Sequence, residues 1–440
     1  SSAASDVYKR QFTTLGEWLS WLENLHHRKI DLSLGRVKAV LSAMELEQPP
    51  YGIITIGGTN GKGSCVAILE SIYVESGYRV GAFTSPHLWK FNERVRVNRR
   101  DATDDELIAA FRAIDSVRGD VTLSYFEYST LVAIVFFATS GVDVAILEVG
   151  LGGRLDAVNA LNPDASMIVS IDLDHEKWLG DTRDAIGVEK AGILRPGRPA
   201  VIADRTPPNS LFDYASDHAI ELQLLGRDFD YDVSSEEAWR YTSVSAEVSN
   251  LPVPSFGGSV RFANAAACIA LVHSLQDKMP FENFALARGI MRTQIVGRIE
   301  RRYLNGVEWI FDVAHNPAAA RILAEELQRR KQPGKTIAIF AAMADKDIFG
   351  LIDPLLPFID HWLVTRADLE RGATENTLID VLAERCVVPM DARTEVADAC
   401  GCAKNLAEEG DRVLVFGSFY IVGPAMTWLG LYCAPSLPDD

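Results

Sequence analysis

The 440-residue sequence predicts an α/β fold in which mainly parallel sheets are covered by helices. Three observations predict this fold. Short runs rich in β-branched residues alternate with longer amphipathic runs, as in βαβ units. A glycine-rich turn, "GGTNGKGS" at 57–64, joins one such strand to a helix. A second series of strands and helices begins near Gly297, so we expect two domains, 1–296 and 297–440.

The first series supplies the larger predicted sheet. Four runs have the pattern of strands: "YGIITIGG" at 51–58, "RVGAFTS" at 79–85, "VDVAILEVG" at 142–150 and "ASMIVSIDLDH" at 165–175. The run "SCVAILESIYVESG" at 64–77 has the pattern of a helix that follows the glycine turn. Residues 220–260 are poorer in helical pattern, and they favour loops with a few antiparallel strands.

The second series predicts a smaller Rossmann-like α/β domain. Its strand patterns are "VEWIFDVAHNP" at 307–317, "KTIAIFAAMADKD" at 335–347, "HWLVTR" at 361–366 and "DRVLVFGSF" at 411–419. A helical run at 318–330 separates the first two. Ligands of such sheets bind at the carboxyl ends of the strands, and we expect the functional residues there.

Composition excludes several classes of function. The formal net charge is −17, which argues against general affinity for nucleic acid or an anionic membrane. The longest apolar run, "LVAIVFFAT" at 131–139, is far shorter than the ~20 residues of a membrane helix. The six cysteines are scattered, as in a reduced intracellular protein. We expect a cytoplasmic monomer that meets anionic substrates with a local positive cluster.

The glycine turn has the features of a phosphate-binding loop. It exposes backbone N–H groups at a helix N-terminus, where the helix dipole also favours phosphate. Lys62 is expected to reach the outer phosphates, and the Ser64 hydroxyl to bind Mg²⁺. The spacing departs from the P-loop pattern, because Ile56 stands where the first glycine belongs and Gly63 precedes the serine. A glycine turn that binds no nucleotide is the alternative.

Polar residues follow three other predicted strands. Hydroxyl, carboxylate and imidazole groups at one sheet edge could hold a divalent metal against ATP phosphates. Each residue also has a structural interpretation, as a turn cap, an ion-pair partner or a hydrogen-bonded histidine. The residues are Ser85 and His87, then Glu148, Arg154 and Asp156, then Asp172, Asp174 and His175. Lys190, near a predicted helix end, has the pattern of a solvated surface charge.

Eleven short motifs occur in order along nearly the whole chain. They are "GTNGKGS" at 58–64, "TSPHL" at 84–88, "ERVRV" at 93–97, "YFEY" at 125–128, "LEVGLGGRLDAVN" at 147–159, "LDH" at 173–175, "EKAGI" at 189–193, "GR" at 297–298, "DVAHNP" at 312–317, "ADKD" at 344–347 and "GSF" at 417–419. With these motifs the sequence resembles the Mur ligase superfamily, and within it the bacterial folylpolyglutamate synthase and dihydrofolate synthase family.

The resemblance implies an ATP-dependent amide ligase with an N-terminal P-loop ATPase domain and a C-terminal glutamate ligase domain. Lys62, His175 and Lys190 are implied as catalytic. ATP contacts are implied for Gly58, Thr59, Asn60, Gly61, Lys62, Gly63, Ser64, Asn264, Arg298, Asp312 and His315. Two Mg²⁺ sites are implied, the first at Ser64 and Glu148, and the second at Ser85, His175 and a carbamylated Lys190 (N6-carboxylysine). Without the resemblance, "DVAHNP" is a plain strand followed by a helix cap.

The N-terminal run "WLSWLENLHHRKIDLSLGRV" at 18–37 resembles the bifunctional members of the family. Candidate pterin contacts are Ile30, Leu32, Ser124, Phe126 and Asp156, of which the apolar residues could equally be core. We expect ligation of L-glutamate to dihydropteroate, which gives dihydrofolate, and to reduced folates. The alternatives are a monofunctional folylpolyglutamate synthase and a P-loop NTPase without ligase activity. A cell-wall Mur ligase would need a UDP-sugar domain before the loop, where this sequence has 56 residues.

Overall fold

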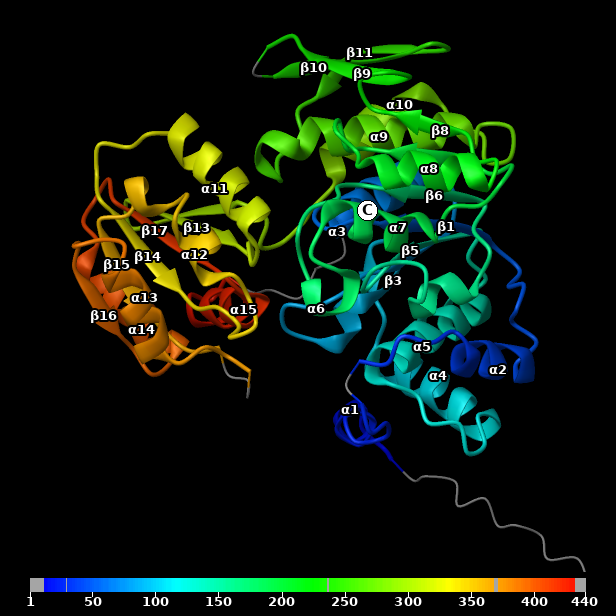
Figure 1. Cartoon of the computed structure of the whole chain (residues 1–440), viewed down its shortest axis with the longest axis horizontal. Coiled ribbons are helices and arrows are strands. Elements are labelled where there is room, and N and C mark those ends of the chain that lie inside the picture. The colour runs from blue at the N-terminus through cyan, green and yellow to red at the C-terminus, as the bar shows by residue number, and fades with distance from the viewer. Residues whose placement is uncertain (1–11, 29, 236, 368–370, 432–440) are drawn as a thin grey trace, which may run out of the picture.

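The computed structural model describes residues 12–28, 30–235, 237–367 and 371–431 (Figure 1). The strands in these residues form three sheets, of eight, three and six strands. Helices cover both large sheets, so the predicted α/β fold is confirmed. None of the helices in the described ranges combines the length and the apolar character needed to cross a membrane.

The eight-stranded sheet is parallel except at one edge. Its order is β4-β3-β2-β5-β1-β6-β7-β8, and only β3 and β4 run antiparallel to their neighbours. The strands are β1 Gly52–Gly57, β2 Val80–Phe83, β3 Val95–Val97, β4 Arg100–Asp101, β5 Val144–Glu148, β6 Ala165–Ile168, β7 Ala200–Ile202 and β8 Leu222–Leu224. The central strands β1, β5 and β6 are buried nearly throughout, as parallel strands with helices on both faces must be.

Helices pack on the two faces of this sheet in separate cores. The core on one face contains side chains of α3 Lys62–Glu75, α9 Arg261–Ser274 and α10 Asn283–Arg292. The other face carries α1 Leu15–Leu22, α2 Gly35–Ala43, α4 Asp104–Val117 and α5 Tyr125–Ser140. The short α6 Glu176–Leu179, with α7 Arg183–Ala191 and α8 Asn209–Asp217, packs in a further cluster with β7 and β8.

Local sequence explains where α5 begins and ends. Ser124 caps its first turn: the Ser124 hydroxyl accepts from Glu127 N, and the Glu127 carboxylate accepts from Ser124 N at 2.8 Å. The helix ends at Gly141, whose φ of 62° is left-handed. The apolar run that the sequence shows at 131–139 is therefore a buried helix of this core.

A small antiparallel sheet packs against α9. Its strands are β9 Phe229–Val233, β10 Ala238–Ser243 and β11 Glu247–Pro252, in the order β11-β10-β9. Trp239 is fully buried and packs edge-on against Phe262 of α9.

The six-stranded sheet has the order β12-β13-β17-β14-β15-β16, and only β12 is antiparallel. The strands are β12 Glu300–Leu304, β13 Val307–Asp312, β14 Thr336–Phe340, β15 His361–Val364, β16 Met390–Ala392 and β17 Arg412–Phe416. The helices are α11 Pro317–Arg329, α12 Ile348–Ile352 and α13 Glu375–Ala383 in one core, and α14 Val396–Leu406 and α15 Phe419–Trp428 in the other. Figure 1 shows this sheet as a separate body beside the larger one.

Candidate active site

The loop between β1 and α3 requires glycine at two positions. Gly58 has φ 144° and Gly61 has φ 87°, a region that residues with a side chain rarely adopt. A Cβ atom added at Gly61 would lie 2.8 Å from Val169 Cγ1. Helix α3 begins directly afterwards at Lys62, so its first N–H groups point toward the loop. The loop therefore has the geometry of a phosphate-binding site.

Hydrogen bonds hold this loop from two sides. Lys62 Nζ donates to the carbonyl oxygens of Gly58, at 3.1 Å, and Thr59, at 3.2 Å. Thr59 N donates to Ser170 O at 2.7 Å, and Asn60 N donates to Ser170 Oγ at 3.0 Å. Ser170 follows β6, which lies next to β1, so a neighbouring strand fixes the loop.

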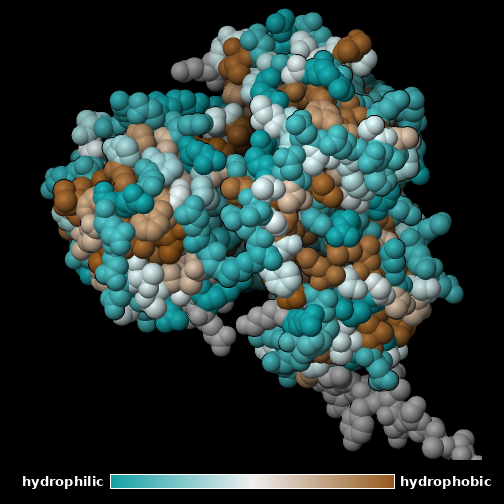
Figure 2. Space-filling view, viewed as in Figure 1, coloured by the Kyte–Doolittle hydropathy of each residue, from teal (hydrophilic) through white to brown (hydrophobic). Residues whose placement is uncertain are grey.

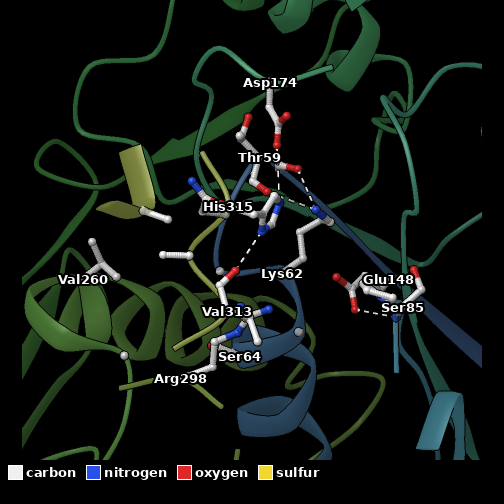
Figure 3. A pocket seen from close by; sticks show the side chains of 18 of the residues that line it. Thr59, Lys62, Ser64, Ser85, Glu148, Asp174, Val260, Arg298, Val313 and His315 are labelled. Atoms are coloured by element: carbon white, nitrogen blue, oxygen red, sulfur yellow. Dashed lines mark hydrogen bonds and ion pairs between the residues drawn. The ribbon is translucent and has the colours of Figure 1, made fainter. Parts of the chain in front are cut away.

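Glu148 lies beside the first turn of α3, and no lysine or arginine in the described ranges forms an ion pair with it. Its carboxylate is 5% exposed and accepts a hydrogen bond from Ser85 N at 3.1 Å (Figure 3). A Cβ at Gly63 would be 3.5 Å from Glu148 Oε2, which places the carboxylate beside Ser64 of the same turn. Burial raises the pKa of Glu148, although the Lys62 charge opposes this. A buried carboxylate in a cavity that Ser64 and Ser85 also line suits a hard divalent cation.

Lys190 and His175 line the same cavity from α7 and from the residue before α6. Lys190 is 3% exposed, and among the described residues its ammonium makes no hydrogen bond or ion pair. Burial lowers the pKa of Lys190 to about 7, and the nearby Lys62 contributes. Burial lowers the pKa of His175 to about 4, so its imidazole is neutral and can donate an electron pair. Lys190 is therefore a buried group, which the surface interpretation of its spacing missed.

These residues test whether a metal fits the site. The described part of the chain has no group of three His, Cys, Asp or Glu side chains placed to bind a metal by themselves. The donors here are instead one carboxylate, one imidazole, hydroxyl groups and a lysine. Such a set fits Mg²⁺ where nucleotide phosphates and a modified lysine supply further oxygens.

The six-stranded sheet contributes the opposite wall of the cavity. Arg298, which precedes β12, places its guanidinium 5.0 Å from the ring centre of Phe419. Asp312 ends β13 and accepts hydrogen bonds from Ile299 N at 2.8 Å and Ala314 N at 2.7 Å. Burial lowers the pKa of Arg298 and raises that of Asp312.

His315 belongs to this wall, whereas Asn264 lines the cavity from α9, on the side of the loop. His315 Nδ1 is 2.9 Å from Val313 O, and Asn264, 4% exposed on α9, lies against Gly61. Thus all residues expected at ATP or at metal line one cavity, which opens in the hollow between the two bodies (Figure 2). They are Gly58, Thr59, Asn60, Gly61, Lys62, Gly63, Ser64, Ser85, Glu148, His175, Lys190, Asn264, Arg298, Asp312 and His315.

A hydrogen-bond network joins the two bodies at this cavity, and sequence reasoning did not find it. Asn60 and Asn316 donate to each other through their amides, at 3.1 and 3.0 Å. Asn316 Nδ2 also donates to Asp174 Oδ2 at 3.1 Å, and Lys346 pairs with the other oxygen of Asp174. Asp174, Asn316 and Lys346 stand in the motifs "LDH", "DVAHNP" and "ADKD", but the motifs give no pairing between them.

Phe126 and Asp156, two candidate acceptor contacts, lie next to the cavity rather than in its lining. The ring of Phe126 covers Gly150, where an added Cβ would be 2.5 Å from Phe126 Cζ, and Gly150 lines the cavity. Asp156 is 2% exposed, and its oxygens accept from Leu151 N at 2.8 Å and Val158 N at 3.0 Å. Burial raises the pKa of Asp156 to about 7.

The other three candidates differ in exposure. Ser124 is 4% exposed and engaged in the cap of α5. Ile30 and Leu32 are half-buried, lie outside helices and strands, and belong to none of the described hydrophobic clusters. The interpretation of these two residues as core is therefore wrong.

Comparisons with known proteins agree with this architecture. The family model described as "Mur ligase, glutamate ligase domain" matches residues 291–419. Dihydrofolate synthase/folylpolyglutamate synthase of Escherichia coli is 38% identical over 94% of both chains, and that of Haemophilus influenzae is 38% identical over 93% of this chain and 96% of its own.

Solved structures of the same family are also similar to this chain. A structure of E. coli FolC with DHPP and ADP has a TM-score of 0.90 and 37% identity, and the match covers 95% of this chain and 98% of that one. The bifunctional enzyme of Yersinia pestis with AMPPNP and Mn has a TM-score of 0.88 at 37% identity, over 95% and 98%. A bifunctional enzyme with Mn, AMPPNP and L-glutamate bound has 0.87 at 36%, over 95% and 98%. The chain therefore belongs to the dihydrofolate synthase/folylpolyglutamate synthase family of Mur ligases.

Proposed function

We propose that this protein is an ATP-dependent ligase that joins L-glutamate to dihydropteroate, forming dihydrofolate, and to reduced folates, extending their glutamate chain. The observation that carries the proposal is the convergence of the phosphate-binding loop, Glu148, Lys190 and His315 on one cavity. Family membership and the ligands of the related structures, DHPP, ADP and L-glutamate, support the same reaction.

The reaction has two steps. A carboxylate oxygen of the acceptor bonds to the γ-phosphorus of ATP while the bond to the β-phosphate oxygen breaks, which yields an acyl phosphate and ADP. The amine of L-glutamate then bonds to the acyl carbon, phosphate leaves, and the amine proton passes to solvent. Acceptor and triphosphate are both anionic, so Lys62 and the N–H groups of the loop must offset their repulsion and align the attack.

Two divalent cation sites belong to the proposal. Ser64 and Glu148 would hold one Mg²⁺, and Ser85, His175 and Lys190 the other. Bound Mg²⁺ supplies positive charge that stabilises the phosphoryl oxygens. The buried carboxylate of Glu148 and the neutral imidazole of His175 fit this assignment.

Lys190 would serve a cation as N6-carboxylysine. Only a neutral amine reacts with CO₂, and burial brings the pKa of Lys190 to about 7, so a large fraction is neutral at physiological pH. The amine nitrogen bonds to the carbon of CO₂ and loses a proton to solvent, which leaves an anionic oxygen donor in place of the ammonium. The absence of a hydrogen-bond or ion-pair partner for the Lys190 ammonium in the part of the chain that the structure describes agrees with this role.

Nucleotide and glutamate would be bound between two domains, 1–296 and 297–440. Arg298, Asp312 and His315 would contact ATP from the side opposite the loop, and Asn264 would contact it from α9, beside the loop. The C-terminal domain would bind glutamate, and the protein would act as a monomer, which light scattering of the purified protein tests.

The acceptor would lie beside Gly150, which lines the cavity and is covered by the ring of Phe126. Phe126, Ile30 and Leu32 would contact the flat pterin ring, and Ser124 and Asp156 its polar edge. Ser124 and Asp156 are buried and already hydrogen-bonded, so their contacts would need small local shifts.

The test is mass analysis of products after incubation with Mg²⁺, ATP and L-glutamate, with dihydropteroate or tetrahydrofolate as acceptor. The proposal expects one added glutamate on both acceptors and none without glutamate. Product from tetrahydrofolate alone reduces the function to chain extension. ATP hydrolysis without product from either acceptor overturns the ligase assignment in favour of an NTPase.

A further inference from the structure

A network of charged side chains holds the segment that carries Ile30 and Leu32, and the proposed reaction does not itself use it. His26 precedes the segment, Asp31 lies within it between Ile30 and Leu32, and Arg36 is in the first turn of α2. His26 Nε2 is 3.1 Å from Asp31 Oδ2, and Arg36 Nη1 is 3.2 Å from the same oxygen. Arg36 Nη2 also donates to Asp31 O at 3.1 Å. Both side chain and backbone of Asp31 are therefore fixed.

The same residues attach the segment to the start of α5. Arg36 Nε donates to both oxygens of Glu127, at 3.1 and 3.2 Å, and its Nη2 is 3.0 Å from Glu127 Oε1. His26 Nδ1 is 2.9 Å from Thr122 Oγ1. In the sequence, Ser124 and Phe126 lie between Thr122 and Glu127. One arginine and one histidine thus connect two stretches of chain that are about ninety residues apart in the sequence.

Burial makes this connection strong. The Glu127 side chain is 4% exposed, and those of Asp31 and Arg36 are 18% and 22% exposed. The His26 hydrogen bond and the Arg36 charge hold the pKa of Asp31 below its usual range. Charge-assisted bonds of this kind, shielded from water, fix geometry better than exposed pairs.

The two apolar residues in this segment do not pack into any hydrophobic core of the described residues. Ile30 and Leu32 are half-buried outside the described hydrophobic clusters, whereas Phe126, at the start of α5 to which the network connects them, packs against the core and reaches Gly150 at the cavity. Folding alone gives no reason to fix two such apolar residues with four polar ones, but the wall of a binding site does.

We propose that Arg36, bound between Asp31 and Glu127, is a positioning residue that fixes the segment carrying Ile30 and Leu32 against the start of α5 and so sets affinity for the acceptor ring. This inference rests on the proposed function. Arg36 touches no reacting atom; it acts through the residues that it holds.

The test compares Asp31→Ala and Arg36→Met with wild type in the product assay with dihydropteroate. Asp31→Ala releases the segment but keeps the buried Arg36–Glu127 pair, so it folds even if Arg36→Met does not. We expect KM for dihydropteroate to rise at least about tenfold in both variants, since displacement by about 1 Å has effects of this size. KM for ATP should stay within about twofold, because the network lies outside the ATP cavity, and Arg36→Lys should recover only part of the loss.

Arg99→Met is the matched control. Arg99 is also half-buried and pairs with a 6% exposed glutamate, Glu75, at 2.8 Å. Glu75 ends α3, about 20 Å along the helix from the phosphate loop. This variant should leave both KM values unchanged.

Hydrogen exchange gives a readout that does not depend on turnover. Amides of residues 26–28 and 30–34 should exchange faster in Asp31→Ala than in wild type or Arg99→Met. Unchanged KM for dihydropteroate, or KM values for dihydropteroate and ATP that rise together, would overturn the positioning role. If wild type makes no product from dihydropteroate, the proposed acceptor is wrong and this inference falls with it.

Discussion

Replacing Lys190 by methionine should make the protein more stable and inactive. Methionine keeps the length of the side chain but removes a buried amine that has no partner among the described residues. Burial lowers the pKa of Lys190 from 10.5 to about 7. A tenfold change in proton affinity is worth about 1.4 kcal/mol, and at pH 7 the folded lysine is about half deprotonated, so it opposes folding by about 4 kcal/mol at that pH.

The sign of the pH dependence follows from the two protonation states. Between pH 7 and 10.5 the unfolded chain holds this proton and the folded chain does not, so wild-type stability rises with pH in that window. The methionine variant has no such group. Its advantage over wild type should therefore fall from about 4 kcal/mol at pH 7 to about 2 kcal/mol at pH 9.

Urea unfolding at pH 7, 8 and 9, in EDTA and CO₂-depleted buffer, measures this difference without metal or carbamate. Lys278→Met is the control, because Lys278 is 53% exposed and its loss should change stability by less than about 0.5 kcal/mol. A variant less stable than wild type at pH 7, or an advantage independent of pH, would refute the reasoning. The variant should also lose ligation while it binds nucleotide with affinity close to wild type, and full ligase activity would refute the metal role.

Three further predictions concern the loop, the acceptor site and the second sheet. Gly61→Ala should abolish ATP binding, measured with a fluorescent nucleotide, whereas Gly77→Ala should not. Both glycines have φ 87°, but only Gly61 lacks space for a Cβ atom. Phe126→Ala should raise KM for dihydropteroate more than KM for ATP; equal effects would count against a pterin contact. Arg412→Met removes one of the two arginines that pair with Glu308, which is 3% exposed and keeps Arg301 at 3.4 Å as well as its hydrogen bonds from Tyr303 and Gln332. The loss of the 2.8 Å contact to Arg412 should lower the free energy of unfolding by about 2 kcal/mol in urea without changing KM for ATP. A loss below about 1 kcal/mol would show that Glu308 is satisfied by its other neighbours.

The loop and the strand ends were predictable because their signals are local. Gly61, Lys62 and Ser64 are adjacent in the sequence, and the strand before them fixes their place. Glu148 could be placed because parallel strands end at one edge. The place of Lys190 in the site could not be predicted from its spacing. The spacing indicates only a helix end, whereas the burial of Lys190 depends on how α7 packs. Only the family resemblance pointed to Lys190 as a site residue.

Contacts between distant segments were beyond local reasoning. Asn60 and Asn316 are joined only because the two sheets meet at this cavity, and His26, Asp31, Arg36 and Glu127 only because α2 packs beside α5. A polar residue in a single sequence shows neither its partner nor its burial. Pattern analysis therefore found the chemistry of the site and missed the residues that hold its parts together.

The side chain of Asn316 matters for inhibitor design. Its carbonyl oxygen accepts from Ala319 N, at the start of α11, and from Asn60, while its nitrogen donates to Asn60 and Asp174. A compound that reaches from the phosphate loop to α11 must replace these bonds or leave them unmade, at about 1 kcal/mol each. Compounds that stop short of Asn316 avoid this loss, so the Gly150 side of the cavity is the better direction in which to extend an inhibitor.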